Sequence, residues 1–283
     1  MKKIIYISLG LIILIGISIL IYPTFKKPSH DRIWWSSLSV LPSAEISDKK
    51  IKVNNVRDWT YDKDGPVTEK WINREYNLDD LEGVWFFMVP FSEWEGLAHT
   101  MMSFDFNNSE PLMISIEARK EKGENYTLLS GMRNEFEMIY IWGTERDFLG
   151  DRILKRGDEI YMYPLDINIE FAKNLFVQML EDTNDIYENP RFYNTLIHNC
   201  TNDLAILANK AEKGTVPMSI GRILPGYSFD LLFRLGYIKD SEENKGVLKE
   251  KYNATEIMRN YINDIDFSTK LRRELKSIQL GAQ

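Results

Sequence analysis

The side chain with the clearest chemical potential is Cys200, in the run Asn199-Cys200-Thr201, and it is the only cysteine of the 283-residue chain. It therefore cannot form an internal disulfide. The spacing of the apolar residues that follow predicts a helix over residues 201–213, which puts Cys200 at a helix N-terminus. The positive end of the helix dipole favours the thiolate, the nucleophilic form of cysteine. Cys200 is a candidate nucleophile.

A thiol nucleophile needs a partner that takes its proton, because a free thiol is mostly protonated at neutral pH. The chain has three histidines, and His99 opens a strand-like run at residues 98–106. His198 is the rival base, but a spacing of two residues rarely aligns a histidine with a cysteine. His30 lies in a spacer near the N-terminus and is expected to be inert. We therefore predict His99 as the base.

A base histidine is usually held by a third group that accepts a hydrogen bond from its other ring nitrogen. Glu117 lies on the strand expected to pair with the His99 strand, and we predict it in this role. The alternative is a surface ion pair between Glu117 and Arg119. We place Arg119 among the residues that bind ligand or line the site.

The residues around Cys200 supply the remaining candidates. Asn199 is expected to cap the helix and Tyr193 to form a wall of the site. The backbone N–H of Cys200, at a helix start, is a candidate oxyanion donor. The simpler alternative is that Cys200 is a small buried hydrophobic residue and His99 a structural histidine. The polar flank of Cys200, from Asn199 to Asp203, favours the reactive thiol.

An apolar run near the N-terminus predicts a membrane anchor at residues 4–22, after a cytoplasmic stub at residues 1–3. As a helix this run spans roughly 28 Å, about the thickness of the hydrocarbon core of a bilayer. The alternative, a cleaved signal peptide, would have a shorter apolar region and small residues at its end. The exit, Tyr22-Pro23-Thr24-Phe25-Lys26-Lys27, has no such pattern, which favours an uncleaved single-pass anchor.

Composition narrows the class of protein. The net charge of −7, with 44% hydrophobic and 27% charged residues, is ordinary for a globular domain and argues against a nucleic-acid partner. The sequence shows no glycine-rich nucleotide motif and no metal-binding motif, so we predict neither a cofactor nor a metal. Residues 23–55 are interpreted as a linker and lead-in, residues 56–238 as the catalytic domain and residues 239–283 as a charged helical tail.

Aromatic and β-branched runs predict strands at residues 56–61, 83–90, 98–106, 112–119, 135–142 and 159–165. Helical spacing appears at residues 167–184, 201–213 and 227–237. In the tail, apolar residues between Val247 and Ile262 allow one amphipathic helix. The elements predict an α+β fold with an antiparallel sheet.

Several short motifs resemble one known family, the N-terminal periplasmic domain of the bacterial lipoprotein N-acyltransferase Lnb. They occur in the order expected for it and cover roughly residues 56–238. The motifs are Val89-Pro90-Phe91-Ser92, Leu97-Ala98-His99-Thr100, Ser115-Ile116-Glu117-Ala118-Arg119, Glu145-Arg146-Asp147, Tyr161-Met162-Tyr163-Pro164-Leu165, Phe192-Tyr193-Asn194-Thr195, Asn199-Cys200-Thr201 and Leu224-Pro225-Gly226-Tyr227.

The resemblance implies a permuted papain-like fold (NlpC/P60-like), with the histidine strand before the cysteine helix. It implies that Cys200 is the nucleophile, His99 the base and Glu117 the acidic member. The implied reaction is acyl transfer from a membrane phospholipid to the N-terminal amine of a lipoprotein. Longer members of the family carry several transmembrane helices after this domain, whereas this chain continues into a charged segment. The resemblance therefore points to membership of the family more directly than to the specific reaction.

The sequence therefore predicts a thiol enzyme at the bacterial cell membrane, with its catalytic domain on the extracytoplasmic side. Its expected partners are membrane lipid and lipoproteins, and no oligomeric state is predicted. The alternatives are a cysteine amidase or peptidase and a non-catalytic interaction domain. An apolar entrance to the Cys200 site would favour acyl chains, and a polar cleft would favour peptides.

Overall fold

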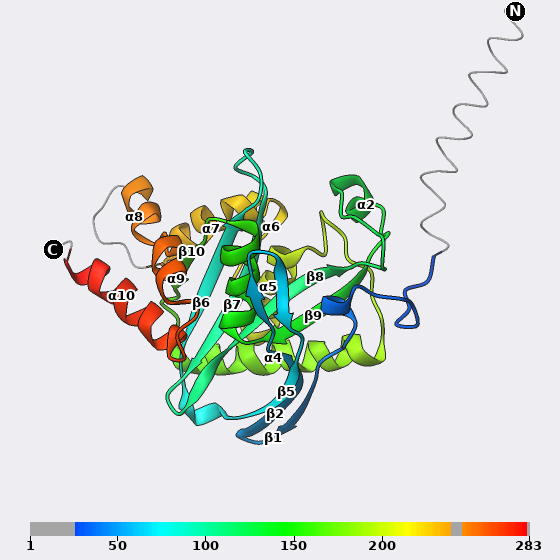
Figure 1. Ribbon diagram of the computed structural model, residues 1–283, viewed down its shortest axis with the longest axis horizontal. Coiled ribbons are helices and arrows are strands. Elements are labelled where there is room, and N and C mark those ends of the chain that lie inside the picture. Colours follow the sequence, from blue (N-terminus) through cyan, green and yellow to red (C-terminus); the bar gives the residue numbers. More distant parts are fainter. Residues whose placement is uncertain (1–25, 239–244, 282–283) are drawn as a thin grey trace, which may run out of the picture.

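The computed structural model describes residues 26–238 and 245–281. Its centre is an eight-stranded sheet with the strand order β1-β2-β9-β8-β7-β6-β10, in which β5 pairs with β2 (Figure 1). Neighbouring strands are antiparallel except β2 and β9. The strands are β1 (Ser43–Ser47), β2 (Lys50–Arg57), β5 (Trp71–Asn77), β6 (Leu81–Pro90), β7 (Ala98–Phe106), β8 (Ser109–Arg119), β9 (Glu137–Gly143) and β10 (Tyr161–Pro164), and a small hairpin adds β3 (Thr60–Asp62) and β4 (Gly65–Thr68). The predicted α+β class and antiparallel sheet are confirmed.

The central strands are buried on both faces. In β6, Phe86 and Met88 belong to one apolar cluster, and Phe87 and Val89, which alternate with them, belong to a second. Because successive side chains of a strand point to opposite faces, the sheet needs a cover on each side. One cover is made by α4 (Ile169–Glu188) and α5 (Cys200–Ala211), with α6 (Ile220–Ile223) and α7 (Ser228–Arg234) beside them.

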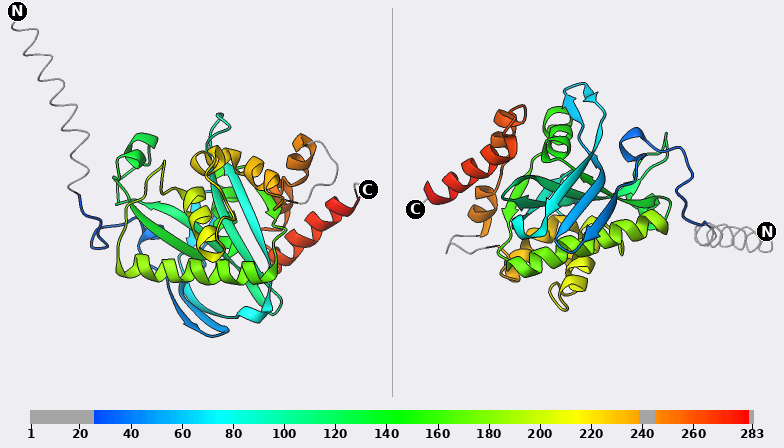
Figure 2. Two further views of the ribbon diagram at one scale, coloured as in Figure 1. Left: turned by 180° about the vertical axis from the view of Figure 1, so that it is seen from behind. Right: turned by 90° about the horizontal axis from the view of Figure 1, so that it is seen from below.

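The second face is covered by α3 (Glu145–Gly150), the π-helix η4 (Asp151–Arg156), α9 (Thr255–Tyr261) and α10 (Phe267–Gly281). Figures 1 and 2 show α10, in red, at the end of the molecule opposite the blue N-terminal segment. Met258, Phe267 and Leu271 are each at most 1% exposed and belong to the second cluster. The two-sided burial therefore depends on segments from both halves of the chain.

The packing extends beyond both ends of the predicted 56–238 domain. Before residue 56, β1 and β2 already pair in the main sheet, and Ile51 and Val53 of β2 are buried in the core. After residue 238, α8 (Lys245–Lys251) contributes buried Leu248 to the first cluster, while α9 and α10 contribute to the second. The tail residues 245–281 thus form several helices that dock on the sheet, in place of the single amphipathic helix that the sequence allowed.

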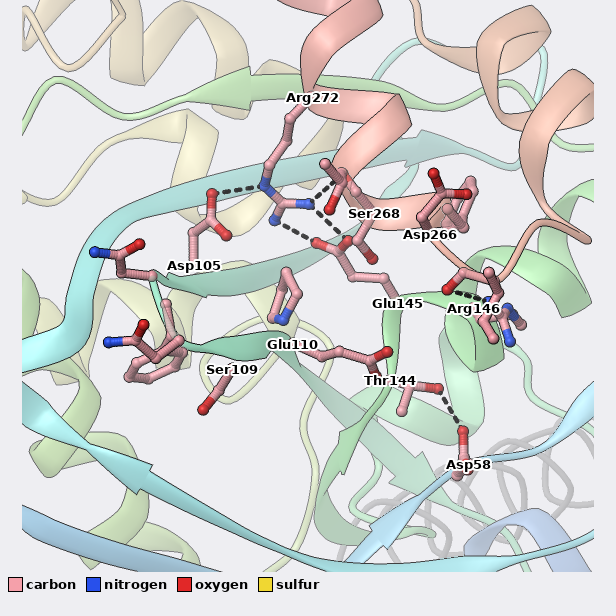
Figure 3. A pocket seen from close by; sticks show the side chains of 17 residues that line it. Asp58, Asp105, Ser109, Glu110, Thr144, Glu145, Arg146, Asp266, Ser268 and Arg272 are labelled. Atoms are coloured by element: carbon pink, nitrogen blue, oxygen red, sulfur yellow. Dashed lines mark hydrogen bonds and ion pairs between the residues drawn. The ribbon is translucent and has the colours of Figure 1, made fainter.

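An ion-paired arginine fixes α10 to the sheet. The Arg272 guanidinium donates hydrogen bonds of 2.8 and 2.7 Å to the Glu145 carboxylate, and its Nε lies 2.7 Å from an oxygen of Asp105 (Figure 3). The Ser103 hydroxyl donates to the same Glu145. Arg272, Glu145 and Asp105 line a polar cavity of about 330 Å³ between α10 and the sheet, and they pair with one another. The ion pairs that line this cavity hold the C-terminal helix against the rest of the protein.

The predicted cytoplasmic stub at residues 1–3 and membrane anchor at residues 4–22 lie outside the described residues. Of the helices within residues 26–238 and 245–281, none combines the length and the apolar composition that a bilayer span requires.

Candidate functional site

Cys200 is the first residue of α5, and Asn199 caps that helix as predicted. The Asn199 side-chain oxygen accepts hydrogen bonds from the amides of Thr201 (2.9 Å) and Asn202 (2.8 Å), and its carbonyl accepts one from the amide of Asp203. Of the first four amides of the helix, the cap therefore accounts for three and leaves that of Cys200. This amide is the predicted oxyanion donor.

The other end of the Asn199 amide anchors the loop before the helix. Its Nδ2 donates to the carbonyls of Thr195, Arg222 and Ile223, at 2.9 to 3.3 Å, so that one side chain joins the start of α5 to the preceding loop and to α6. His198, the rival base, turns its Nδ1 to Asp203 at 3.0 Å. That contact occupies His198 away from the thiol and leaves His99 as the histidine of the Cys200 site.

His99 lies near the start of β7, on the strand that pairs with β8. The register pairs Met101 with Ser115, and continuing it by two residues sets His99 opposite Glu117. The His99 Nε2 is 2.7 Å from the Ser115 hydroxyl and 3.1 Å from a Glu117 oxygen, and Ser115 donates to that same oxygen at 2.7 Å. With Nε2 occupied, Nδ1 is the ring nitrogen that remains for Cys200.

A threonine pair joins the strand that carries His99 to the helix that begins with Cys200. The hydroxyls of Thr100, next to His99, and Thr201, next to Cys200, lie 2.8 Å apart. This bond joins β7 to the first turn of α5. Both threonines are buried, and Cys200 itself is 3% exposed. The nucleophile candidate is thus held against the histidine strand by its immediate neighbours in sequence.

The three titratable groups shift one another toward their charged forms. Burial alone would lower the pKa of His99, but the charges of Glu117 and Cys200 outweigh it and raise that pKa to about 9. Burial alone would raise the pKa of the Cys200 thiol, yet the charge and hydrogen bond of His99 bring it below its ordinary value. The same imidazolium holds the pKa of Glu117 well below its usual range against the effect of burial. The arrangement favours a thiolate–imidazolium pair.

These groups open into a cavity of about 400 Å³, which we call the Cys200 pocket; its lining includes His99, Glu117, Asn199 and Tyr193. Much of the rest of the wall is apolar and comes from the β6–β7 loop, α2 (Leu128–Met132) and the loops on either side of α5. These residues include Phe91, Trp94, Leu128, Met132 and Leu196, and Leu224 adds to them from the turn after α6. Phe91, Trp94, Met132 and Leu196 are also 41% to 50% exposed, so the apolar wall continues to the mouth.

Gly226 holds one part of this wall in place. A Cβ on Gly226 would lie 1.6 Å from the carbonyl oxygen of Glu95, and the Gly226 amide donates to the carbonyl of Gly96 at 3.2 Å. Only glycine allows this close approach of two backbone segments.

Arg119 is the predicted wall residue that does not face the pocket. Its guanidinium donates to the carbonyls of Leu38 and Ser39, both at 2.9 Å, lies 3.0 Å from His30 Nδ1 and stacks over Trp34. Glu117 is therefore not its partner. Arg119 shares a face of β8 with Glu117, but it lies two residues further along the strand, where residues Leu38 and Ser39 of the N-terminal segment cover the sheet.

Sequence reasoning missed Ser115, Thr100 and Arg152. Ser115 precedes Glu117 by two residues on the same strand, so strand alternation alone could have placed both beside His99. Arg152 lines the Cys200 pocket from η4, and its charge contributes to the low pKa of Glu117. No local sequence signal marks Arg152, because it reaches the site only through the packing of η4 on the sheet. Within residues 26–238 and 245–281, no group of three or more His, Cys, Asp or Glu side chains is arranged to hold a metal ion.

Comparison with known families gives one match. The family model described as the Lnb N-terminal periplasmic domain matches residues 67–226, a range that contains His99, Ser115, Glu117 and Cys200. Comparisons with curated proteins and with solved structures gave no match. The description of the family supports an extracytoplasmic location for this domain. Since the matched residues make up more than half of the 283-residue chain, the protein belongs to the Lnb N-terminal periplasmic domain family.

Proposed function

We propose that this protein is an extracytoplasmic thiol enzyme that transfers acyl groups, with Cys200 as nucleophile, His99 as base and acid, and Glu117 as the group that holds His99. The observation that carries the proposal is the position of His99. Its Nε2 is fixed by Ser115 and Glu117, and its Nδ1 is left for a thiol whose pKa lies below the ordinary value. A buried structural cysteine would have no need of a charged partner.

The first half of the reaction forms a thioester. The Cys200 thiolate attacks the carbonyl carbon of an ester, and the carbonyl electron pair moves to the oxygen, near the Cys200 amide N–H. As the tetrahedral intermediate collapses, the carbon–oxygen bond to the leaving group breaks. The His99 Nδ1–H gives its proton to the departing alcohol. Glu117 and Ser115 keep the ring oriented while its charge changes.

The second half transfers the acyl group. An amine attacks the thioester carbonyl, the new carbon–nitrogen bond forms and the amine proton passes to His99 Nδ1. The carbon–sulfur bond then breaks and returns the thiolate. Water in place of the amine gives a free acid, so the same residues perform transfer or hydrolysis according to the acceptor.

The apolar wall of the Cys200 pocket favours an acyl chain as the substrate. Side chains such as Phe91, Trp94, Leu128 and Met132 offer a hydrocarbon surface close to the thiol, and burial of a chain there is favourable by about 0.8 kcal/mol per methylene. A peptide substrate would leave its backbone amides without partners against such a wall. We propose, with the family, a phospholipid acyl donor and a lipoprotein N-terminal amine as acceptor, on a permuted papain-like fold tethered to the membrane by residues 4–22.

Intact-mass labelling of the full chain in membranes tests this function. The probe is an acyl-activated ester, and the variants are Cys200→Ala, His99→Ala and His198→Ala. We expect an acyl adduct on the wild type that is absent from Cys200→Ala and falls at least about a hundredfold in rate for His99→Ala. His198→Ala is the matched control and should label at close to the wild-type rate, because His198 is paired with Asp203.

Absence of an adduct on the wild type, with Cys200 intact, would overturn the proposal in favour of an interaction domain. Equal labelling of the His99 variant would show that the histidine is structural. Faster acylation by activated peptide amides than by lipid esters would favour the amidase.

A further inference from the structure

The charged groups around the Cys200 pocket are unevenly distributed. Apart from Cys200, its partners His99 and Glu117, and two tyrosines, the titratable side chains in the lining are Lys120, Arg152 and Arg156, all of them cations. The chain as a whole has a net charge of −7. Carboxylates outnumber Lys and Arg side chains in the chain, 42 to 35, so the excess of cations in this lining does not follow from composition.

A π-helical turn brings two of the cations together. Arg152 and Arg156 lie four residues apart on η4, which ends at Gly157 with a φ of 70°. Both side chains line the Cys200 pocket. π-helical turns are rare and often occur at functional sites. Burial lowers the pKa of Arg152 and the charge of Arg156 lowers it further, while nearby carboxylates act in the opposite direction.

The hydrogen-bonding capacity of these cations is only partly used. Arg152 donates to Asp158 through one nitrogen at 3.2 Å, and Arg156 pairs with Asp151 through one nitrogen at 2.6 Å. Each guanidinium has five N–H donors, so both retain donors for another acceptor. Within the described residues, the Lys120 ammonium takes part in no side-chain hydrogen bond or ion pair.

The three cations also mark the polar end of the pocket. A second cavity of about 400 Å³, lined among others by Arg57, Tyr61 and Lys155, shares four lining residues with the Cys200 pocket. The shared residues are Lys120, Arg152, Arg156 and Glu117. The three cations therefore lie where the Cys200 pocket adjoins the polar cavity.

We propose that Lys120, Arg152 and Arg156 form an anion subsite that binds a phosphate ester head, and that the ligand of the Cys200 pocket is an acyl amphiphile carrying such a head. The choice of an acyl ligand rests on the proposed function; the anion subsite stands on its own residues. Two guanidinium forks and one ammonium suit the several oxygens of a phosphate group. The subsite would place the ester of the ligand next to the thiol by holding its head.

Binding of non-reactive probes to the full chain in a neutral detergent tests the subsite. The probes are dodecyl phosphate, 1-O-dodecylglycerol and inorganic phosphate, none of which has a carbonyl for Cys200 to attack. By calorimetry we expect dodecyl phosphate to bind about tenfold to a hundredfold more tightly than the neutral ether. One or two hydrogen bonds to a charged group supply a difference in affinity of this size. Inorganic phosphate should bind more weakly than dodecyl phosphate, because it lacks the chain.

Charge-neutralising variants then locate the subsite. Arg152→Gln and Arg156→Gln should each lower the preference for dodecyl phosphate by about tenfold. Lys155→Gln is the matched control, with the same charge change on the same turn, and should retain the preference, because Lys155 does not line the Cys200 pocket. Equal binding of the phosphate and the neutral ether, or an equal loss in Lys155→Gln, would overturn the proposal. Inorganic phosphate binding as tightly as dodecyl phosphate would overturn the lipid head in favour of free phosphate.

Kinetics with a pair of acyl donors distinguishes two roles for these cations: binding of the phosphate head, and orientation of Glu117. The donors carry the same chain, one with a phosphate head and one without. A subsite predicts that Arg156→Gln raises the KM of the phosphate donor alone, whereas a positioning role would lower kcat for both donors. If no donor acylates Cys200 but dodecyl phosphate keeps its preference, the thiol chemistry fails and the anion subsite stands.

Discussion

Replacing Glu117 by Gln should weaken the thiolate–imidazolium pair while leaving the shape of the site intact. Glu117 contacts His99 Nε2 at 3.1 Å and accepts the Ser115 hydroxyl at 2.7 Å. Glutamine retains an acceptor for that hydroxyl but removes the negative charge, which is the largest effect that raises the pKa of His99 against burial. The variant therefore changes the electrostatics of the site more than its packing.

The magnitude follows from the pKa of His99. Its rise from the ordinary value of 6.5 to about 9 corresponds to about 3 kcal/mol of preference for the imidazolium. Glu117 and Cys200 together supply this preference, and they also overcome the opposing effect of burial on the pKa of His99. If Glu117 supplies half of it or more, Glu117→Gln costs about 1.5 to 3 kcal/mol, or about tenfold to a hundredfold in the rate of acylation.

The pKa values of Cys200 and His99 also set the direction in which the acylation rate changes with pH. The thiolate–imidazolium pair exists between the lowered pKa of Cys200 and the raised pKa of His99, so acylation should fall as pH rises through about 9 and His99 loses its proton. In Glu117→Gln, the pKa of His99 falls and the thiolate loses stabilisation. The pH range over which the variant acylates should therefore be narrower than in the wild type. Its alkaline limb should lie at lower pH and its acid limb at higher pH.

Alkylation of the chain by iodoacetamide, followed by intact mass, measures the acid limb directly, because Cys200 is the only thiol. We expect the midpoint of the alkylation rate to lie below the ordinary thiol value in the wild type and to move up in Glu117→Gln. Glu110→Gln, the same change on the same strand at a 60% exposed position, should leave the midpoint where it was. A midpoint unchanged or lowered in Glu117→Gln would refute the assigned role of Glu117.

Two further variants test how the site is built. Arg272→Ala should lower the free energy of unfolding by about 3 to 5 kcal/mol in urea titrations, because it leaves buried carboxylates without their cation, whereas Arg273→Ala, at an exposed position, should change it by less than about 0.5 kcal/mol. A small effect at Arg272 would mean that α10 docks through its apolar face alone. Asn199→Ala should cost about 2 to 4 kcal/mol by the same measurement, since it removes a helix cap and the bonds to the carbonyls of Thr195, Arg222 and Ile223. A loss below about 0.5 kcal/mol would contradict the role of Asn199 in holding the start of α5 to the preceding loop and to α6.

Local sequence patterns predicted the elements that carry the thiol and the histidine. Alternation and turn residues predicted the pair of strands now seen as β7 and β8, and helical spacing predicted α4 and α5. The strand pairing then brought His99 and Glu117 together, because their register depends only on a short connection. These contacts are short-range in sequence or lie on one hairpin.

Contacts between distant segments could not be predicted in the same way. The pairing of β2 with β5 and β9, which makes residues before 56 part of the sheet, has no local signal. The charged composition of the tail concealed its buried face, since Arg272 is an ion-paired core residue that resembles a surface arginine in sequence. Arg119 was misplaced for the same reason: its partners at Leu38 and Ser39 come from a segment interpreted as a linker.

The two-sided burial of the sheet explains why the site depends on segments so far apart in sequence. The residue after His99, Thr100, faces α5 and bonds to Thr201, while Ser103, on the His99 side of the same strand, bonds to Glu145 under α10. One strand thus contacts the helix that bears the thiol and the group that anchors the C-terminal helix. Because β-strands pack as units, a shift of β7 toward either cover would alter the distance between His99 and Cys200. Through Glu145 and Asp105, the helix α10 is therefore held to the same strand that carries His99.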